Sequence, residues 1–261
     1  MTGIIFVLVA FLASVIGCIC GIGGGVIIKP VLDAFGLYSV STISFMSGCI
    51  VLSMTTYSVA KAKLANESVI EKGVSTWLGL GAAAGGLLGK QLFDTVKALF
   101  ENADTVGAVQ AAALFAVTLG TAIYTVNKEK VTTLRIKNAV GCILIGLALG
   151  LMSSFLGIGG GPINLVVLYY FFSMETKTAA QNSLYIIFFS QLASLLFTLI
   201  SGKVPDFPVG LFICMVCCGI LGGVVGRKIN KKIADRTVSK LFLGLMVVIM
   251  GICCYNFYRY C

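Results

Sequence analysis

Long apolar runs separated by short polar segments dominate the hydropathy pattern of the chain. Six of these runs carry no charged residue and approach or exceed the roughly 20 residues that a helix needs to cross a bilayer. They are residues 34–60, 73–89, 105–127, 178–202, 207–226 and 241–258. The pattern therefore predicts an all-α polytopic membrane protein with six ordinary spanning helices.

Two further apolar stretches, residues 2–28 and 138–174, are each interrupted by the sequence GIGGG, at Gly21–Gly25 and Gly157–Gly161. Each stretch is too long for a single crossing, and three consecutive glycines have almost no helix propensity. We therefore expect each stretch to enter the membrane and turn back at the glycines. The returning arms, about residues 26–37 and 162–172, are predicted to be half-helices, and Pro162 suits the first position of the second one.

The two pentapeptides begin 136 residues apart, at residues 21 and 157, and other residues repeat at an offset of 136 or 137. Ser47 matches Ser183, Ser58 matches Ser194, and GGLLGK at 85–90 matches GGVVGR at 222–227. The sequence thus predicts a first membrane repeat at residues 1–126, a linker at 127–137 and a second repeat at 138–261. A hairpin plus three spanning helices is an odd number of net crossings, so we expect inverted-topology repeats.

The distribution of lysine and arginine favours this topology. With hairpins at both breaks, 14 of the 19 basic residues fall on one side of the membrane and five on the other, and the positive-inside rule places both termini outside the cytoplasm. The five on the sparse side are Lys29, Lys90, Lys97, Lys203 and Arg259.

Composition excludes several classes of protein. Hydrophobic residues make up 58% of the chain, charged residues 11%, and mean hydropathy is +1.02, which rules out a water-soluble domain. The net charge of +9 comes from basic residues in short loops, so its role is expected to be topological and no nucleic-acid partner is expected. The chain has ten cysteines and no histidine. Nine of the cysteines lie within apolar runs, and we expect free thiols packed as small hydrophobes, with no metal site and no cofactor.

The glycine breaks are the first candidate binding site. Glycines ahead of a helix leave backbone N–H groups without intrahelical partners, and the helix dipole adds partial positive charge, which favours an anion. Two such breaks from inverted repeats would bring together Gly23, Gly24, Gly25, Gly159, Gly160 and Gly161. Alternatively, the glycines only allow helices to cross closely, the role we expect for the small residues at 81–89 and 219–226.

Polar residues on the helices that follow the breaks extend the candidate set. Amide side chains inside an apolar span are costly unless they find partners, so Asn164, Gln181, Asn182 and Gln191 are stronger candidates than the serines Ser47 and Ser183. Lys29 has two interpretations: it attracts the anion, or it pairs with Asp33 near the surface, which we favour. No carboxylate lies clearly in mid-membrane apart from Asp33 at a boundary, so proton coupling through a buried carboxylate is not expected.

Both glycine motifs, together with Ala179–Leu184 (AAQNSL), make the chain resemble the TauE/SafE family of membrane proteins, the sulfite exporters. AAQNSL is similar to the family's A-x-G-T-S-L element, with Gln181 and Asn182 in place of Gly and Thr, and only Ser47 survives of that element in the first half. The resemblance implies an oxoanion carrier of the bacterial inner membrane that moves sulfite or organosulfonates, chiefly outward.

We therefore expect a secondary transporter in the lipid bilayer that moves a small anionic substrate by alternating access around the two breaks. The small-residue helix faces permit a homodimer. An anion channel is the nearest alternative, and a membrane assembly or thiol-handling protein is another. An enzyme is not expected, because neither a catalytic dyad nor a set of metal ligands is visible.

Overall fold

The computed structural model describes residues 2–64, 72–100 and 103–260, and every regular element in these residues is a helix. The helices are α1 Thr2–Cys20, α2 Gly25–Phe35, α3 Val40–Leu64, α4 Lys72–Leu99, α5 Ala103–Asn127, α6 Ala139–Phe155, α7 Pro162–Phe172, α8 Thr176–Ile200, α9 Val209–Lys232 and α10 Asp235–Tyr260. A short 3-10 turn, η1 Lys128–Lys130, follows α5.

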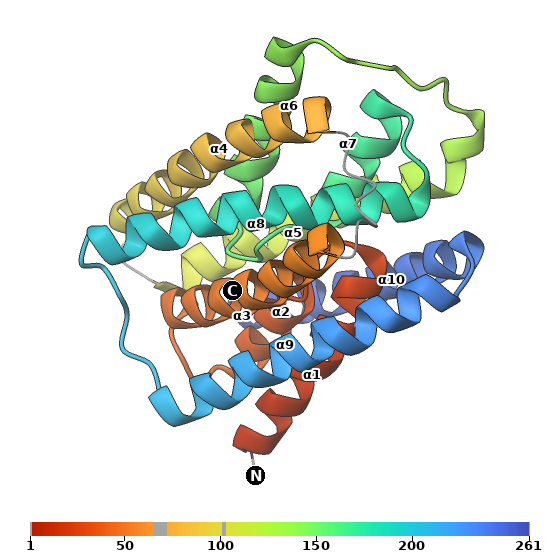
Figure 1. The fold of residues 1–261 in the computed structure, drawn as a ribbon. Coiled ribbons are helices and arrows are strands. Elements are labelled where there is room, and N and C mark those ends of the chain that lie inside the picture. Colours follow the sequence, from red (N-terminus) through yellow and green to blue (C-terminus); the bar gives the residue numbers. More distant parts are fainter. Residues whose placement is uncertain (1, 65–71, 101–102, 261) are drawn as a thin grey trace.

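In both halves a short helix stands second and three long helices follow it, and the halves make reciprocal contacts. The second helix of each half, α2 or α7, has only 11 residues. Helix α4 packs against α6 and α8, as α9 packs against α1 and α3, while α2 contacts α10 as α7 contacts α5. Helices α3 and α8 lie between the α4–α6 pair and the α1–α9 pair (Figure 1). Each half therefore completes its packing with helices of the other.

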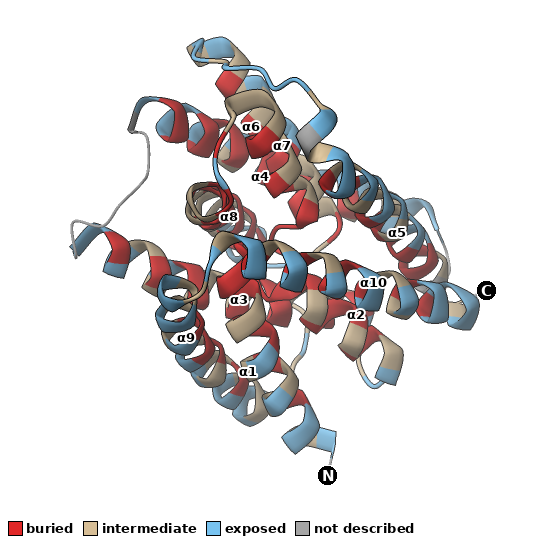
Figure 2. Ribbon diagram, turned by 90° about the vertical axis from the view of Figure 1, so that its right-hand side faces the viewer, coloured by how far each residue is buried: buried red, intermediate tan, exposed pale blue. Residues whose placement is uncertain are grey.

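Six of the described helices are long and apolar enough to cross a membrane: α1, α3, residues 105–127 of α5, α8, α9 and α10. The expected span at 73–89 belongs to α4, which is not one of these six. Side chains such as Leu12, Leu144 and Val247 are 56%, 61% and 65% exposed. Exposed residues lie mainly on the outward faces of the helices (Figure 2). Such surfaces suit lipid, and the chain is a multi-pass membrane protein.

The small-residue segments serve close helix packing, as predicted. A Cβ added to Gly85 of α4 would overlap the carbonyl oxygen of Leu147 in α6. In the reciprocal contact, a Cβ on Gly222 of α9 would lie 2.6 Å from the carbonyl oxygen of Phe11 in α1. These glycines therefore pack against helices of the same chain, and the homodimer stays a prediction.

Both helix breaks form where the sequence predicts them. Helix α1 ends at Cys20 and α2 begins at Gly25; α6 ends at Phe155 and α7 runs from Pro162 to Phe172, the predicted range. Helix α2 ends two residues before the predicted Leu37, because Gly36 adopts a left-handed conformation with φ of 61° and caps it. The breaks are therefore turns between a long helix and a short one.

The two breaks touch each other in the middle of the protein. A Cβ added to Gly23 would lie 3.2 Å from the carbonyl oxygen of Gly159, and one added to Gly160 would lie 3.1 Å from the carbonyl oxygen of Ile22. Gly23, Gly159 and Gly160 also have positive φ values of 75°, 67° and 129°. Side chains at these positions would strain the backbone and separate the breaks, so glycine is required.

The cysteines correct one expectation. The nine within the described residues are free thiols, but only four are buried: Cys18, Cys20, Cys142 and Cys253. Cys214, Cys217 and Cys254 are exposed on outer helix faces. The prediction that all nine pack as small hydrophobes inside the protein was therefore wrong, because apolar runs in a membrane helix face lipid as often as they face the core.

Candidate functional site

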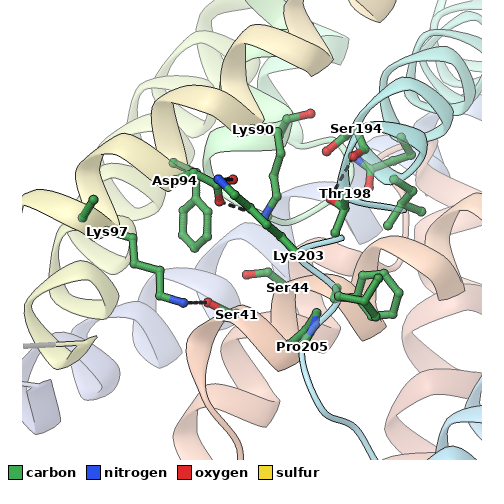
Figure 3. Close-up of a pocket in the computed structure, with 17 residues that line it drawn as sticks. Ser41, Ser44, Lys90, Asp94, Lys97, Ser194, Thr198, Lys203 and Pro205 are labelled. Carbon is green, nitrogen blue, oxygen red and sulfur yellow. Dashed lines mark hydrogen bonds and ion pairs between the residues drawn. The ribbon is translucent and has the colours of Figure 1, made fainter. Parts of the chain in front are cut away.

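A cavity of about 470 Å³, the wide vestibule, opens where the start of α3 meets the ends of α4 and α8 (Figure 3). The α8–α9 loop and Gly157 of the second break complete its wall. The lining residues are Ser41, Ser44, Phe45, Lys90, Phe93, Asp94, Lys97, Ala98, Ser154, Gly157, Gln191, Ser194, Leu195, Thr198, Lys203, Val204 and Pro205. Segments from both halves of the chain thus build one hollow.

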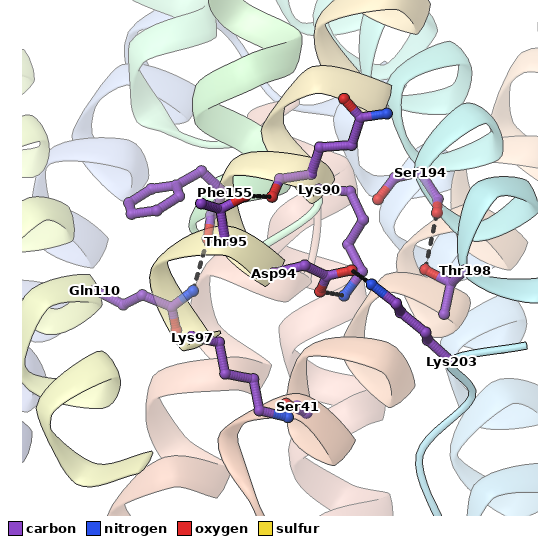
Figure 4. A network of polar contacts seen from close by, with 11 residues as sticks. Ser41, Lys90, Asp94, Thr95, Lys97, Gln110, Phe155, Ser194, Thr198 and Lys203 are labelled. Atoms are coloured by element: carbon purple, nitrogen blue, oxygen red, sulfur yellow. Dashed lines mark hydrogen bonds and ion pairs between the residues drawn. The ribbon is translucent and has the colours of Figure 1, made fainter. Parts of the chain in front are cut away.

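The rim of the wide vestibule carries three lysines and one carboxylate (Figure 4). Asp94 lies between Lys90 Nζ, at 3.4 Å, and Lys203 Nζ, at 3.3 Å. Lys97 Nζ donates a hydrogen bond of 2.8 Å to the hydroxyl of Ser41. The rim therefore has an excess of positive charge, which attracts anions to the entrance.

Neutral polar groups gather deeper in the wide vestibule. The hydroxyls of Ser44 and Ser154 are buried and have no hydrogen-bond partner among the described residues. Gln191 of α8 is 4% exposed and lines the same space. Gly157 lies beside them with φ of 64°, and Ser44 Oγ is 2.5 Å from where its Cβ would be. Hydroxyl and amide donors can bind an anion and release it, whereas a buried ring of cations would hold it.

A second and much smaller cavity, the narrow vestibule of about 30 Å³, lies at the opposite ends of α3 and α8. Its lining residues are Cys18, Ser58, Val59, Ala62, Ala180, Gln181, Leu184, Arg227, Asn230 and Lys231. Side chains cross it: Arg227 donates a 2.8 Å hydrogen bond to the carbonyl oxygen of Ser58, and Asn230 donates one of 2.6 Å to that of Ile19. The thiol of Cys18 lies 3.4 Å from the hydroxyl of Ser58. These contacts close this end.

The two vestibules are lined by corresponding positions of the two halves. Nine of the ten residues of the narrow vestibule have a counterpart in the wide one at the repeat offset of 136 or 137 residues. The pairs are Cys18 with Ser154, Ser58 with Ser194, Val59 with Leu195, Ala62 with Thr198, Ser44 with Ala180, Phe45 with Gln181, Lys90 with Arg227, Phe93 with Asn230 and Asp94 with Lys231. One set of positions therefore forms an open space in one half and a closed contact in the other.

The predicted glycines meet between the vestibules, and none of the six lines either cavity. A Cβ on Gly25 would overlap the carbonyl oxygen of Ile158 and lie 2.9 Å from Ser47 Oγ, while one on Gly159 would lie 3.2 Å from Cδ of Gln191. Gly24 packs on Ser14 of α1, and Gly161 caps the start of α7. The glycines thus form the closely packed layer behind the floor of the wide vestibule.

The predicted amides and serines divide between the two ends. Gln191 lines the wide vestibule, whereas Gln181 lines the narrow one and its Oε1 is buried without a partner among the described residues. Asn182 instead accepts a hydrogen bond from Ser75 of α4 and donates one of 2.8 Å to the carbonyl oxygen of Thr178. The side-chain oxygens of Ser47, Asn164 and Ser183 are buried without partners among the described residues.

Lys29 and Asp33 form the predicted ion pair, with Nζ 2.7 Å from Oδ2. The pair does not lie at the surface as expected, because the side chains are only 4% and 7% exposed. Helix α2 is too short to carry its second turn out of the protein, and α10 covers it.

Several lining residues were not singled out from the sequence. Lys90, Lys97 and Lys203 entered only as topology markers, because their meeting at one rim depends on tertiary packing. Ser154 could have been found: it occupies a hydroxyl position three residues before the second glycine pentapeptide, at the end of an apolar helix.

Comparison with known protein families gives one match. The model of the family described as sulfite exporter TauE/SafE matches residues 6–252. No curated protein and no solved structure matches the chain. The match covers both breaks, both vestibules and all ten helices in whole or in large part.

Proposed function

Because the chain belongs to the sulfite exporter TauE/SafE family, we propose that it is a secondary transporter of small sulfur-containing oxoanions such as sulfite or organosulfonates, and that it exports them by alternating access. The family is one of membrane transporters rather than enzymes, which agrees with the fold. The anion is bound in the vestibule that is open, next to the glycine breaks, and is released through the other.

The matched pair of vestibules carries this proposal. Corresponding residues line a cavity of about 470 Å³ at one end of α3 and α8 and one of about 30 Å³ at the other. If the two halves are inverted repeats, each can adopt the conformation of the other, and exchange would close the wide vestibule and open the narrow one. The observed arrangement is then one of two equivalent states.

A specific contact suggests how the vestibules exchange. In the narrow vestibule Cys18 of α1 touches Ser58 of α3, at 3.4 Å. Their counterparts in the wide vestibule, Ser154 of α6 and Ser194 of α8, share no hydrogen bond, since the Ser154 hydroxyl has no partner. Opening as we propose it breaks the contact at this level of the hairpin arm, while α6 and α8 stay together through the hydroxyls of Ser153 and Ser190, 3.5 Å apart.

The side chains of the wide vestibule fit an oxoanion. Sulfite and sulfonate groups present several acceptor oxygens, and the hydroxyls of Ser44 and Ser154 and the amide of Gln191 offer donors. From the positive-inside rule we infer that the wide vestibule faces outside and the narrow vestibule faces the cytoplasm. A bacterial cytoplasmic membrane is part of the same proposal. The structure then corresponds to the releasing state of an exporter.

Flux measurements test this function. Proteoliposomes that contain the full chain should show saturable efflux of sulfite or a sulfonate, and external unlabelled anion should accelerate the exchange of labelled anion. An anion channel would give flux that does not saturate and no accelerated exchange. Absence of flux for sulfite and for every small sulfonate would contradict the function.

Replacing Gln191 with leucine is expected to weaken the binding of the anion while leaving the fold intact. Hydrogen bonds to charged groups contribute about 1.5–3 kcal/mol, so the KM for efflux should rise about 10- to 100-fold. Gln91→Leu, an exposed position on α4, is the matched control and should leave KM unchanged. An unchanged KM in Gln191→Leu would remove this amide from the binding site.

A further inference from the structure

The Lys29–Asp33 pair belongs to the first half-helix, and the second half-helix has no ion pair at the matching positions. The corresponding positions in the second half, 136 residues further on, are Leu165 and Tyr169, both without charge at neutral pH. The pair is nevertheless buried, and burying two charges is costly even when they meet at 2.7 Å. Packing of a half-helix does not need two buried charges, because the matching positions of the second half-helix are uncharged. The pair is therefore expected to have a function of its own.

Next to the pair lies a cavity of about 10 Å³ between α2, α5 and α10. Three acceptor oxygens buried around it have no partner among the described residues: Asp33 Oδ1, Gln110 Oε1 and Asn256 Oδ1. The amide orientations are fixed, because Gln110 Nε2 donates to the carbonyl oxygen of Phe155 at 2.6 Å and Asn256 Nδ2 to that of Pro30 at 2.8 Å. The space is about that of one water molecule, and three acceptor oxygens without partners in the described chain lie around it.

The other charged or titratable groups that face the pair come from α10. The guanidinium of Arg259 donates to the carbonyl oxygens of Asp33, at 2.8 Å, and Ala34, at 2.7 Å, so it caps the end of α2 and does not bond the carboxylate. The thiol of Cys253 lines the small cavity. Gln110 of α5 also lines the cavity and does not titrate, and Leu156 and Ile158 of the second break line it as well. Asp33 is therefore the acid of this site, and Lys29 is its direct counterion.

The side chain of Lys29 lies directly behind the floor of the wide vestibule without lining it. Its Cε lies 3.3 Å from where a Cβ of Gly157 would be, on a residue that lines the vestibule and adjoins Ser44. Ser44 shares this place, with Oγ 2.5 Å from the same Cβ position, so the stem of the lysine meets the floor of the proposed anion site beside Ser44. The side chain of Lys29 thus has a carboxylate at its ammonium end and the floor of the proposed anion site beside its stem.

Resting on the proposed function, we propose that Asp33 is a proton-binding site through which each transported monovalent anion is accompanied by one proton. The empty site holds Lys29 positive and Asp33 negative, with no net charge. A bound anion adds one negative charge and competes for Lys29, and a proton from water then forms an O–H bond at Asp33 Oδ1. The loaded site is again neutral, with the anion on Lys29 and a protonated carboxyl group facing the acceptor oxygens of Gln110 and Asn256.

This assignment reverses the expectation from the sequence that no buried carboxylate couples transport to protons. It also changes what drives export. An anion and a proton that leave together carry no net charge, so the membrane potential contributes nothing. The outward gradient of the anion drives the flux, and an acid equivalent leaves with it.

Methanesulfonate tests the proposal, because its charge does not change in the neutral pH range. In proteoliposomes of the full chain, a pH gradient at zero potential should concentrate it about tenfold per pH unit, as expected for one proton per anion. A potential of 100 mV without a pH gradient should have no effect, whereas an anion that moves alone would distribute about 50-fold. Proton movement measured with a pH-sensitive dye should equal one per methanesulfonate.

Asp33→Asn should exchange one dependence for the other: accumulation driven by the pH gradient disappears and the potential begins to drive flux. Asp206→Asn, an exposed carboxylate in the α8–α9 loop, is the control and should behave like the wild type. Wild-type flux that follows the potential and ignores pH would overturn the coupling, and the proton count on wild-type protein decides this even if Asp33→Asn does not fold. If the protein transported neither sulfite nor any sulfonate, the proposed transport function would be overturned, and this inference with it.

Discussion

Replacing Gly25 with alanine should reduce transport by more than about tenfold and lower the stability of the protein. A Cβ at this position would overlap the carbonyl oxygen of Ile158 in the opposite break, and the obstacle is backbone that cannot rotate away. Overpacking of this kind costs about 1–3 kcal/mol when side chains can adjust, and more is expected for two backbones. Because every 1.4 kcal/mol is a factor of ten, efflux of sulfite should fall by more than about tenfold.

Gly244 in α10 provides the matched control, since an added Cβ there meets no atom within 4 Å. Gly244→Ala should keep wild-type flux and thermal stability, and alanine even favours a helix over glycine. Equal flux in Gly25→Ala and Gly244→Ala would mean that contact between the breaks does not matter for transport.

Ser58→Cys should allow transport to be switched off by oxidation. The native Cys18 thiol lies 3.4 Å from the Ser58 hydroxyl, so a cysteine at residue 58 would be close enough for a disulfide between α1 and α3. If opening of the narrow vestibule separates these helices, the disulfide traps the present state. Flux should fall to that of protein-free liposomes after oxidation and recover on reduction.

Two controls make the Ser58→Cys experiment decisive. The double variant Cys18→Ala with Ser58→Cys cannot form this bond and should be insensitive to the oxidant. Oxidised Ser58→Cys, with the disulfide formed, should still bind sulfite at the wide vestibule, because the wide vestibule stays open. A cross-linked protein that transports normally would show that α1 and α3 need not separate.

The sequence predicted the membrane fold and both breaks because these depend on local properties. Gly157–Gly161 followed by Pro162 ends one helix and starts another whatever surrounds it, and α7 occupies the predicted residues. The pairing of Lys29 with Asp33 was likewise a matter of spacing along one helix. The predicted end of α2 was less accurate, because the left-handed conformation of Gly36 ends the helix before Leu37.

The vestibules could not be predicted, because they depend on how distant helices meet. Lys90, Lys97 and Lys203 come from α4 and a loop more than 100 residues later, and only packing brings them to one rim. The depth of Asp33 was misjudged for the same reason: it follows from α10 covering α2, which no local pattern indicates. The roles of the predicted glycines, Asn164, Gln181, Asn182 and Ser183 in binding stay predictions.

The exchange of the two vestibules can be measured with a second pair of cysteines. Ser154→Cys and Ser194→Cys occupy the repeat positions of Cys18 and Ser58, in a background where the other cysteines are replaced. In the present structure the two positions line the wide vestibule and share no bond. If the halves alternate, oxidation during turnover should join them, stop efflux and expose Ala62→Cys in the narrow vestibule to a thiol reagent from the cytoplasmic side. Sustained transport in which residues 154 and 194 never cross-link would contradict alternation of the two halves.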